Sequence, residues 1–227
     1  MSPTIKSMNP IAFPTFIGRA FTVSGPDVYL SALEGIPPGS VYVQGNTGGS
    51  TPALFSPGWT HAYVKPRGGV AVVVDGGVYK SFQCEGAAVS MFAAFATPAI
   101  GINRREGRCN EDVVCGGIVV GSGDIILGDA DGVVVIPSAC EDEFFAKIEA
   151  FVHCNGCFGK VAARAMADGV PMTEEPALAD MFERKYANPE CYWREYESWW
   201  AKWKDVDGYG ELDTGNGASA AFYSKER

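Results

Sequence analysis

The chain has 227 residues, of which 47% are hydrophobic and 20% are charged, so it can bury a core as one domain plus an extension or as two small domains. Its formal net charge is −9 and its pI is near 4.7, which argues against nucleic acid or an anionic membrane as the main partner, because both require a basic face. No apolar run reaches the roughly 18 residues of a membrane span, and residues 1–13 lack the apolar segment of a secretory signal. The seven scattered cysteines are typical of reduced thiols, so a cytoplasmic location is expected.

Strands and helices alternate in the first part of the chain. Residues 16–23 are rich in strand formers, and residues 40–44 predict a short strand. Helical spacing of apolar residues over 27–34 predicts a helix that ends at the following glycine. A glycine-rich loop covers 45–50, and residues 52–66 predict a helix interrupted by a Pro-Gly pair.

Strands dominate the middle of the chain. Residues 69–75 form a continuous apolar, β-branched run, which predicts a strand buried on both faces. Residues 112–120 are also strand-like, and residues 124–127 and 132–136 predict two strands around a tight turn. Residues 87–96 are small and apolar and predict a packed helix.

The last part of the chain is expected to be helical. Helices are predicted over 140–152 and 160–167, followed by a connector with a short helix over 171–188. The segment 189–204 has aromatic residues at helical spacing, and the final 20 or so residues predict a tail. The aromatic residues are Tyr192, Trp193, Tyr196, Trp199, Trp200 and Trp203. We expect them to be buried on the domain or between subunits; the alternative is that they line a pocket for a substrate larger and more apolar than pyruvate.

Three motifs resemble the RraA-like family. The first is Gly-Arg-Ala-Phe-Thr-Val at 18–23, and the second is Arg-Gly-Gly-Val-Ala-Val-Val-Val-Asp-Gly at 67–76. The third runs from Cys-Gly-Gly at 115–117 through Gly123-Asp124 to the Asp-Ala-Asp-Gly of 129–132 and its following strand. All three stand in the family's order and spacing within residues 16–170.

The resemblance implies an α/β fold, a swivelling β/β/α-type sandwich domain over residues 1–170. An aromatic-rich helical extension and tail would occupy 171–227. It also implies a homotrimer or hexamer whose active site lies in a cleft between subunits. In the aldolase branch of the family, a divalent metal and an arginine hold the oxo acid, and the metal stabilises a pyruvate enolate. The regulator branch binds a ribonuclease and performs no chemistry.

The residues that would hold the metal are replaced in this chain. The family motif Asp-Gly-x-x-Arg-Asp is here Asp75-Gly76-Gly77-Val78-Tyr79-Lys80, so Tyr79 stands for the substrate-binding arginine and Lys80 for the metal-ligating aspartate. Gly58 stands where the family has an acid in the preceding loop. Mg²⁺ and Mn²⁺ require oxygen ligands, and a lysine charge ~4 Å from the ion would repel it. The sequence therefore predicts that no metal and no other cofactor is bound.

The resemblance also aligns a helical arginine of the neighbouring subunit with Arg164. That alignment places Lys160 at the position of a third family acid. A third acid is therefore also absent from the predicted site.

Lys80 is the main catalytic candidate. Its ammonium group can neutralise a developing enolate or hold a carboxylate, and its amine can form a Schiff base. Tyr79 and His61 are candidates for proton transfer. The alternatives are a surface lysine left by metal loss, a packing tyrosine and a packed or surface histidine.

The candidate substrate-binding residues come from four segments. The glycine-rich loop offers backbone N–H groups for an anion, Asp75 follows the central strand, and a basic loop reaches toward the cleft. For Asp75 the alternative is a structural role in an Asp-Gly turn, and for the basic loop it is a solvated surface. The residues are Gly48, Gly49, Gly58, Trp59, Asp75, Arg104 and Arg105. The Cys-x-x-Cys at 154–157, next to His153, follows a predicted helix and is not expected to be a redox or zinc site.

Three functions remain open from the sequence. The first is a metal-independent enzyme of aldolase descent that performs retro-aldol cleavage, decarboxylation, dehydration or cyclisation on a small oxo- or enol-bearing molecule. The second is a non-catalytic binding protein on the same fold. The third is an ordinary metal-dependent oxo-acid aldolase or decarboxylase that uses substitute ligands such as Asp75. A pocket around Lys80 favours the first, and an exposed Lys80 on a flat surface favours the second.

Overall fold

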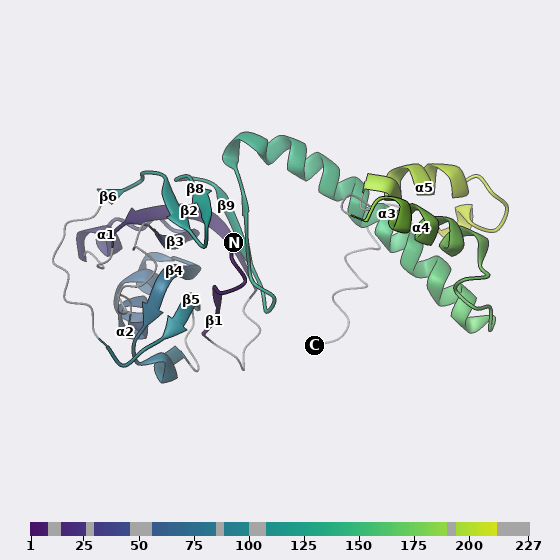
Figure 1. Cartoon of the computed structure of the whole chain (residues 1–227). Helices are drawn as coiled ribbons and strands as arrows, with labels where there is room; N and C mark the ends of the chain where they lie inside the picture. The colour runs from purple at the N-terminus through teal and green to yellow at the C-terminus, as the bar shows by residue number, and fades with distance from the viewer. Residues whose placement is uncertain are drawn as a thin grey trace. The chain divides into compact units, whose positions relative to one another are not determined.

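The structure is a computed structural model, and it divides the chain into two compact units, Met1–Glu141 (unit 1) and Asp142–Arg227 (unit 2). Within these units it describes residues 1–8, 15–25, 30–45, 56–84, 89–99, 108–189 and 194–212. Figure 1 shows both units. None of the helices in these ranges is both long enough and apolar enough to cross a membrane.

Unit 1 is built on a mixed, barrel-like sheet (Figure 1). The strand order is β1 (Lys6–Ser7), β5 (Ser90–Ala96), β4 (Ala71–Val78), β3 (Ser40–Gly45), β2 (Phe16–Ser24), β9 (Ile125–Gly128) and β10 (Val133–Ile136), with β6 (Arg108–Cys109) paired to β2. Strands β2, β3, β4 and β5 are parallel, and the remaining pairs are antiparallel. The α/β fold predicted from the sequence is confirmed.

Both faces of the central strands are buried, as the apolar run at 69–75 predicted. Alternate residues of β4 enter two different apolar clusters, since successive side chains of a strand point to opposite faces. Val72 and Val74 join the cluster that contains Leu33 and Val64 from the helical segments. Ala71 and Val73 join the cluster on the other face.

Short helical segments and a hairpin cover the two faces of this sheet. The first face is covered by α1 (Leu30–Glu34) and η1 (Thr60–Val64), and η1 is flanked in the chain by the short turns α2 (Pro57–Trp59) and η2 (Lys65–Arg67). The second face is covered by a hairpin of β7 (Val113–Cys115) and β8 (Ile118–Val120). Two more 3-10 turns, η3 (Ser81–Cys84) and η4 (Ser138–Cys140), follow β4 and β10.

Two sequence predictions in unit 1 are corrected. The packed helix predicted over 87–96 is wrong, because Ser90–Ala96 forms strand β5, which pairs with β4 and buries Met91 and Phe92. Small apolar residues fit either structure, and here pairing in the sheet decided between them. The strand expected over 112–120 is a hairpin, since Gly116 and Gly117 adopt φ values of 57° and 78°, which reverse the chain.

Unit 2 is helical. A single helix, α3 (Glu141–Ala167), replaces the two helices predicted over 140–152 and 160–167, because the Asn-Gly pair between them does not break it. It is followed by α4 (Pro176–Ala187), α5 (Glu195–Trp203) and the short turn η6 (Gly210–Leu212). The helices predicted within 171–188 and 189–204 are confirmed. The tail predicted for the last 20 or so residues is wrong at its start, because Tyr209 is buried and Gly210–Leu212 forms η6, and the residues from 213 onward lie outside the described ones.

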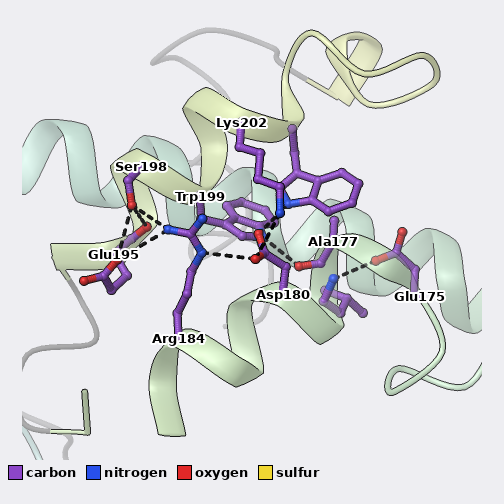
Figure 2. A network of polar contacts seen from close by, with 10 residues as sticks. Glu175, Ala177, Asp180, Arg184, Glu195, Ser198, Trp199 and Lys202 are labelled. Carbon is purple, nitrogen blue, oxygen red and sulfur yellow. Dashed lines mark hydrogen bonds and ion pairs between the residues drawn. The ribbon is translucent and has the colours of Figure 1, made fainter. Parts of the chain in front are cut away.

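The predicted burial of the aromatic residues is confirmed for Tyr196, Trp199 and Trp200 in the interior of unit 2, while Trp203 is half-buried and Tyr192 and Trp193 lie outside the described residues. Trp199 is fully buried, and its Nε1–H donates to the Ala177 carbonyl at 2.7 Å (Figure 2). The centroid of its ring lies 5.6 Å from that of the Phe158 ring. Tyr196 and Trp200 are buried beside it. These rings pack on helices α3 and α4, so they are not available to line a substrate pocket.

Polar contacts hold α4 against α5 around this interior. Arg184 contacts Asp180 and also binds Glu195 and Ser198 of the other helix, as Figure 2 shows. The Trp203 indole donates to Asp180 at 2.7 Å.

The boundary between the two compact units falls after Glu141. The sequence analysis placed the end of the family domain at residue 170, and that domain limit stays a prediction.

Candidate functional site

The candidate site follows the carboxyl ends of the parallel strands of unit 1. Parallel pairing brings the ends of β2, β3, β4 and β5 to one edge of the sheet, which is where ligands bind in open α/β folds. β4 continues past its last pair with β3, Gln44 with Val74, and ends at Val78. The Thr97 N–H donates to the Val78 carbonyl at 3.0 Å and fixes the end of β5 beside it.

Lys80 is held in an unusual backbone conformation just beyond β4. Its φ is 56°, in the left-handed region that residues other than glycine rarely occupy. Its carbonyl accepts the Gln83 N–H at 2.9 Å, which closes the turn into η3. The side chain is exposed, and its Nζ lies 5.4 Å from the ring centroid of Tyr79. Backbone strain of this kind gathers at functional sites, so the conformation favours a specific role for Lys80.

Asp75 lies inside β4, so the alternative of an Asp-Gly turn is wrong. Asp75 and Gly76 fall in a register shift between Val74 and Gly77, where β4 bulges against β5. The half-buried carboxylate accepts the Gly116 N–H at 3.1 Å, which ties β4 to the turn of the β7–β8 hairpin. Burial, followed by the Asp75 charge, raises the pKa of the Cys115 thiol to about 12. Asp75 therefore has a structural contact.

The segment that contains Gly58 lies beside the turn that contains Lys80, because residues of α2 contact residues of η3. Gly58 is exposed, and a Cβ placed there would meet only the Ser56 hydroxyl, at 3.6 Å. Trp59 ends α2 and His61 lies in η1, but their side chains are outside the described residues. The structure thus brings Gly58 and Lys80 to the same region.

Four candidate substrate-binding residues lie outside the described residues. Gly48 and Gly49 follow β3 in the sequence, and Arg104 and Arg105 follow β5. Both segments come after strands that end at the same edge as β4. Their roles stay predictions.

The residues at this edge do not fit a divalent metal. Lys80 carries a cation and donates only, Gly58 has no side chain, and the Asp75 carboxylate already accepts a backbone N–H. Within the described ranges, no three His, Cys, Asp or Glu side chains lie close enough together to hold an ion. We therefore derive no catalytic step through a metal.

Lys160 and Arg164 bind their own chain in unit 2. Lys160 Nζ donates to the Leu212 carbonyl at 3.0 Å, and Arg164 donates to the Gly208 carbonyl. The Arg164 guanidinium also lies 4.7 Å from the ring centroid of Tyr209. Both cations therefore hold the 208–212 segment onto α3.

Two features of unit 1 were not identified from the sequence. Asp124 is buried and accepts the Gly121 and Ser138 N–H groups at 2.8 and 2.9 Å, so this motif acid is structural. Phe82, in η3, is 71% exposed two residues after Lys80. A single sequence carries no signal for that exposure, because phenylalanine is normally buried.

A cavity of about 460 Å³ lies away from Lys80, between Met1–Pro3 and the β9–β10 turn.

Comparison with known proteins agrees with this α/β fold. The family model described as "RraA-like: Aldolase/RraA" matches residues 1–135, so the chain belongs to the RraA-like family. A protein of Halalkalibacterium halodurans, provisionally named a 4-hydroxy-4-methyl-2-oxoglutarate aldolase, is 31% identical over 151 residues, which cover 65% of this chain and 70% of that protein.

Two solved structures share the fold. The RNA-processing inhibitor RraA from Thermus thermophilis is 26% identical, with a TM-score of 0.54 over 60% of this chain and 84% of that one. A protein of Pseudomonas syringae has a TM-score of 0.62 over 77% of this chain and 83% of its own, at 23% identity, and supports the fold alone. The family thus includes relatives named as an aldolase and as an inhibitor of RNA processing.

Proposed function

We propose that the chain is a metal-independent enzyme of aldolase descent that performs lyase-type or enolate chemistry on a small oxo- or enol-bearing molecule. The observation that carries the proposal is the placement of Lys80. It lies at the carboxyl edge of the parallel strands, in a strained backbone conformation, where the family resemblance expects a metal-ligating acid. A cation therefore stands where the aldolases of the family hold one.

The chemistry follows from that charge. In a retro-aldol step, a base removes the hydroxyl proton of the substrate, the C–C bond breaks, and its electron pair moves to the oxo group to form an enolate. The Lys80 ammonium stabilises the negative oxygen, and protonation of the enolate carbon by Tyr79 or His61 completes the step. Decarboxylation passes through the same enolate, with CO₂ as the leaving group.

Self-association as a homotrimer or hexamer is part of the proposal. Ile17, Leu127 and Val134 are directly paired across β2, β9 and β10, and Ile17 and Val134 are 55% and 58% exposed. A row of exposed aliphatic side chains on a sheet favours contact with a second copy. Light scattering should give a multiple of three of the 24.2 kDa chain, and a monomer would contradict it.

The direct test is the pair Lys80→Ala and Lys80→Arg. With oxaloacetate and 4-hydroxy-4-methyl-2-oxoglutarate as probes, Lys80→Ala should lose activity by about a hundred- to a thousandfold, the usual loss of a transition-state electrostatic contact. Lys80→Arg keeps the charge, so it retains activity if charge suffices and loses it if a Schiff base forms.

A matched control is Lys65→Ala. Lys65 is also exposed in unit 1, but it precedes β4 and lies away from its carboxyl end. It should retain full activity. If a turnover found in the parent chain is unchanged in Lys80→Ala, the catalytic role is wrong.

A non-catalytic binding protein is the second candidate. The exposure of Lys80 in the single chain favours it, because catalysis by charge works best away from water. Two results together would support this alternative. The parent chain would turn over neither probe, and Lys80 would still react with an amine-modifying reagent in the assembled oligomer.

A further inference from the structure

The exposed phenylalanine side chains of unit 1 gather at the edge that carries Lys80. Among its described residues, those with exposed rings are Phe82, at 71%, and Phe95, at 38%. Phe82 follows Lys80 in η3, and Phe95 is paired with Gly77 near the end of β4. Other rings of this unit, such as Phe21 and Phe92, are buried in its core.

Exposure of Phe82 is not explained by packing in unit 1. It is the most exposed large hydrophobic side chain in the described part of this unit. The turn that holds it is ordered by the bond from the Gln83 N–H to the Lys80 carbonyl, so the ring and the cation are presented by one short segment. Exposed apolar groups placed beside a few polar groups are typical of ligand sites.

We propose that this site accepts 2-oxo acids or enols that carry an aromatic ring, with Phe82 as the specificity-determining residue. The inference rests on the proposed function of Lys80. The anionic oxo-acid end of the substrate meets the Lys80 ammonium, and its ring packs on Phe82 in an offset or edge-to-face arrangement. The Tyr79 ring, whose centroid lies 5.4 Å from Lys80 Nζ, helps to position the ammonium.

The test compares two probes that differ only by a ring, pyruvate and phenylpyruvate, by isothermal titration of the 227-residue chain. The parent chain should bind phenylpyruvate about tenfold more tightly than pyruvate. Phe82→Ala should reduce that preference to about twofold or less, chiefly by weakening the binding of phenylpyruvate. Phe82→Leu keeps an apolar side chain without a ring and should lose most of the preference.

Phe145→Ala is the matched control. Phe145 is 44% exposed, but it belongs to α3 in unit 2, so its loss should leave both affinities unchanged. Circular dichroism establishes that each variant is folded, which is expected because Phe82 is exposed.

Lys80→Ala separates the two proposals. It should weaken both probes. If the parent chain binds the two probes equally and Lys80→Ala weakens both, the aromatic preference is overturned and the role of Lys80 is kept. If Lys80→Ala binds the probes as tightly as the parent chain does, the proposed function is overturned. An unchanged preference in Phe82→Ala, or no binding of either probe at millimolar concentration, would overturn the inference drawn here.

Discussion

Phe82 and Trp199 are both aromatic, yet one is 71% exposed in a short turn of unit 1 and the other is fully buried in unit 2. Phe82 has a strained lysine as its close neighbour in the chain, whereas Trp199 packs on Phe158 and Trp200 and donates to a backbone carbonyl. The carboxyl edge of the sheet therefore leaves groups accessible for binding. The interior of unit 2 uses the same residue types for stability, and this difference can be tested one side chain at a time.

The largest effect is expected for Trp199→Ala. Removing a fully buried indole leaves a cavity and removes the hydrogen bond to the Ala177 carbonyl, so the free energy of unfolding of unit 2 should fall by about 3–5 kcal/mol. Phe82→Ala, at the exposed edge, should change it by less than about 0.5 kcal/mol. Denaturant unfolding measures both. Similar losses for the two variants would break the comparison.

A smaller effect is expected for Glu175→Ala. The buried carboxylate accepts the Leu178 N–H at 2.7 Å, capping α4, and accepts the Tyr209 hydroxyl. Its loss should cost about 2 kcal/mol of unfolding free energy. Asp75→Ala, which removes the half-buried carboxylate that accepts the Gly116 N–H, should cost about 1 kcal/mol. If Asp75→Ala is the more damaging change, Asp75 anchors unit 1 more firmly than its bond to the Gly116 N–H indicates.

The smallest expected effect is a dependence of unit 2 stability on alkaline pH. Burial, and then the hydrogen bond and charge of Glu175, raise the pKa of Tyr209 from 10.0 to about 12. The protonated phenol is favoured in the folded state, so its contribution is complete below pH 10 and is lost as the pH rises toward about 12. The midpoint temperature of thermal unfolding should fall more steeply over that pH range in the parent chain than in Tyr209→Phe. Parallel curves would contradict the shift.

The sequence predicted the elements whose pattern is local. The strands at 16–23 and 40–44 and the doubly buried run at 69–75 are present because β-branched residues and flanking glycines specify them. Strand β5 was missed because small apolar residues fit a helix as well as a strand. The two predicted helices form one helix, α3, because the packing of Cys157 and Val161 stabilises the helix by more free energy than the Asn-Gly pair inside it costs.

At the candidate site, the sequence identified positions and missed their environment. The place of Lys80 in the chain follows from the family resemblance, but its left-handed backbone and the exposure of Phe82 depend on how β4 passes into η3. Asp75 was placed in a turn because Asp-Gly usually forms one, whereas pairing with β5 extends β4 through it as a bulge.

The central claim is that Lys80 takes the place of the metal, and titration with Mn²⁺ followed by electron paramagnetic resonance tests it most directly. The purified parent chain should contain no stoichiometric metal and should leave added Mn²⁺ free in solution, because Lys80 repels the ion and Gly58 offers no ligand. Lys80→Asp, which removes the charge and adds a carboxylate, should bind Mn²⁺ more tightly than the parent chain does. One tightly bound Mn²⁺ per parent chain, displaced by Mg²⁺, would contradict the account.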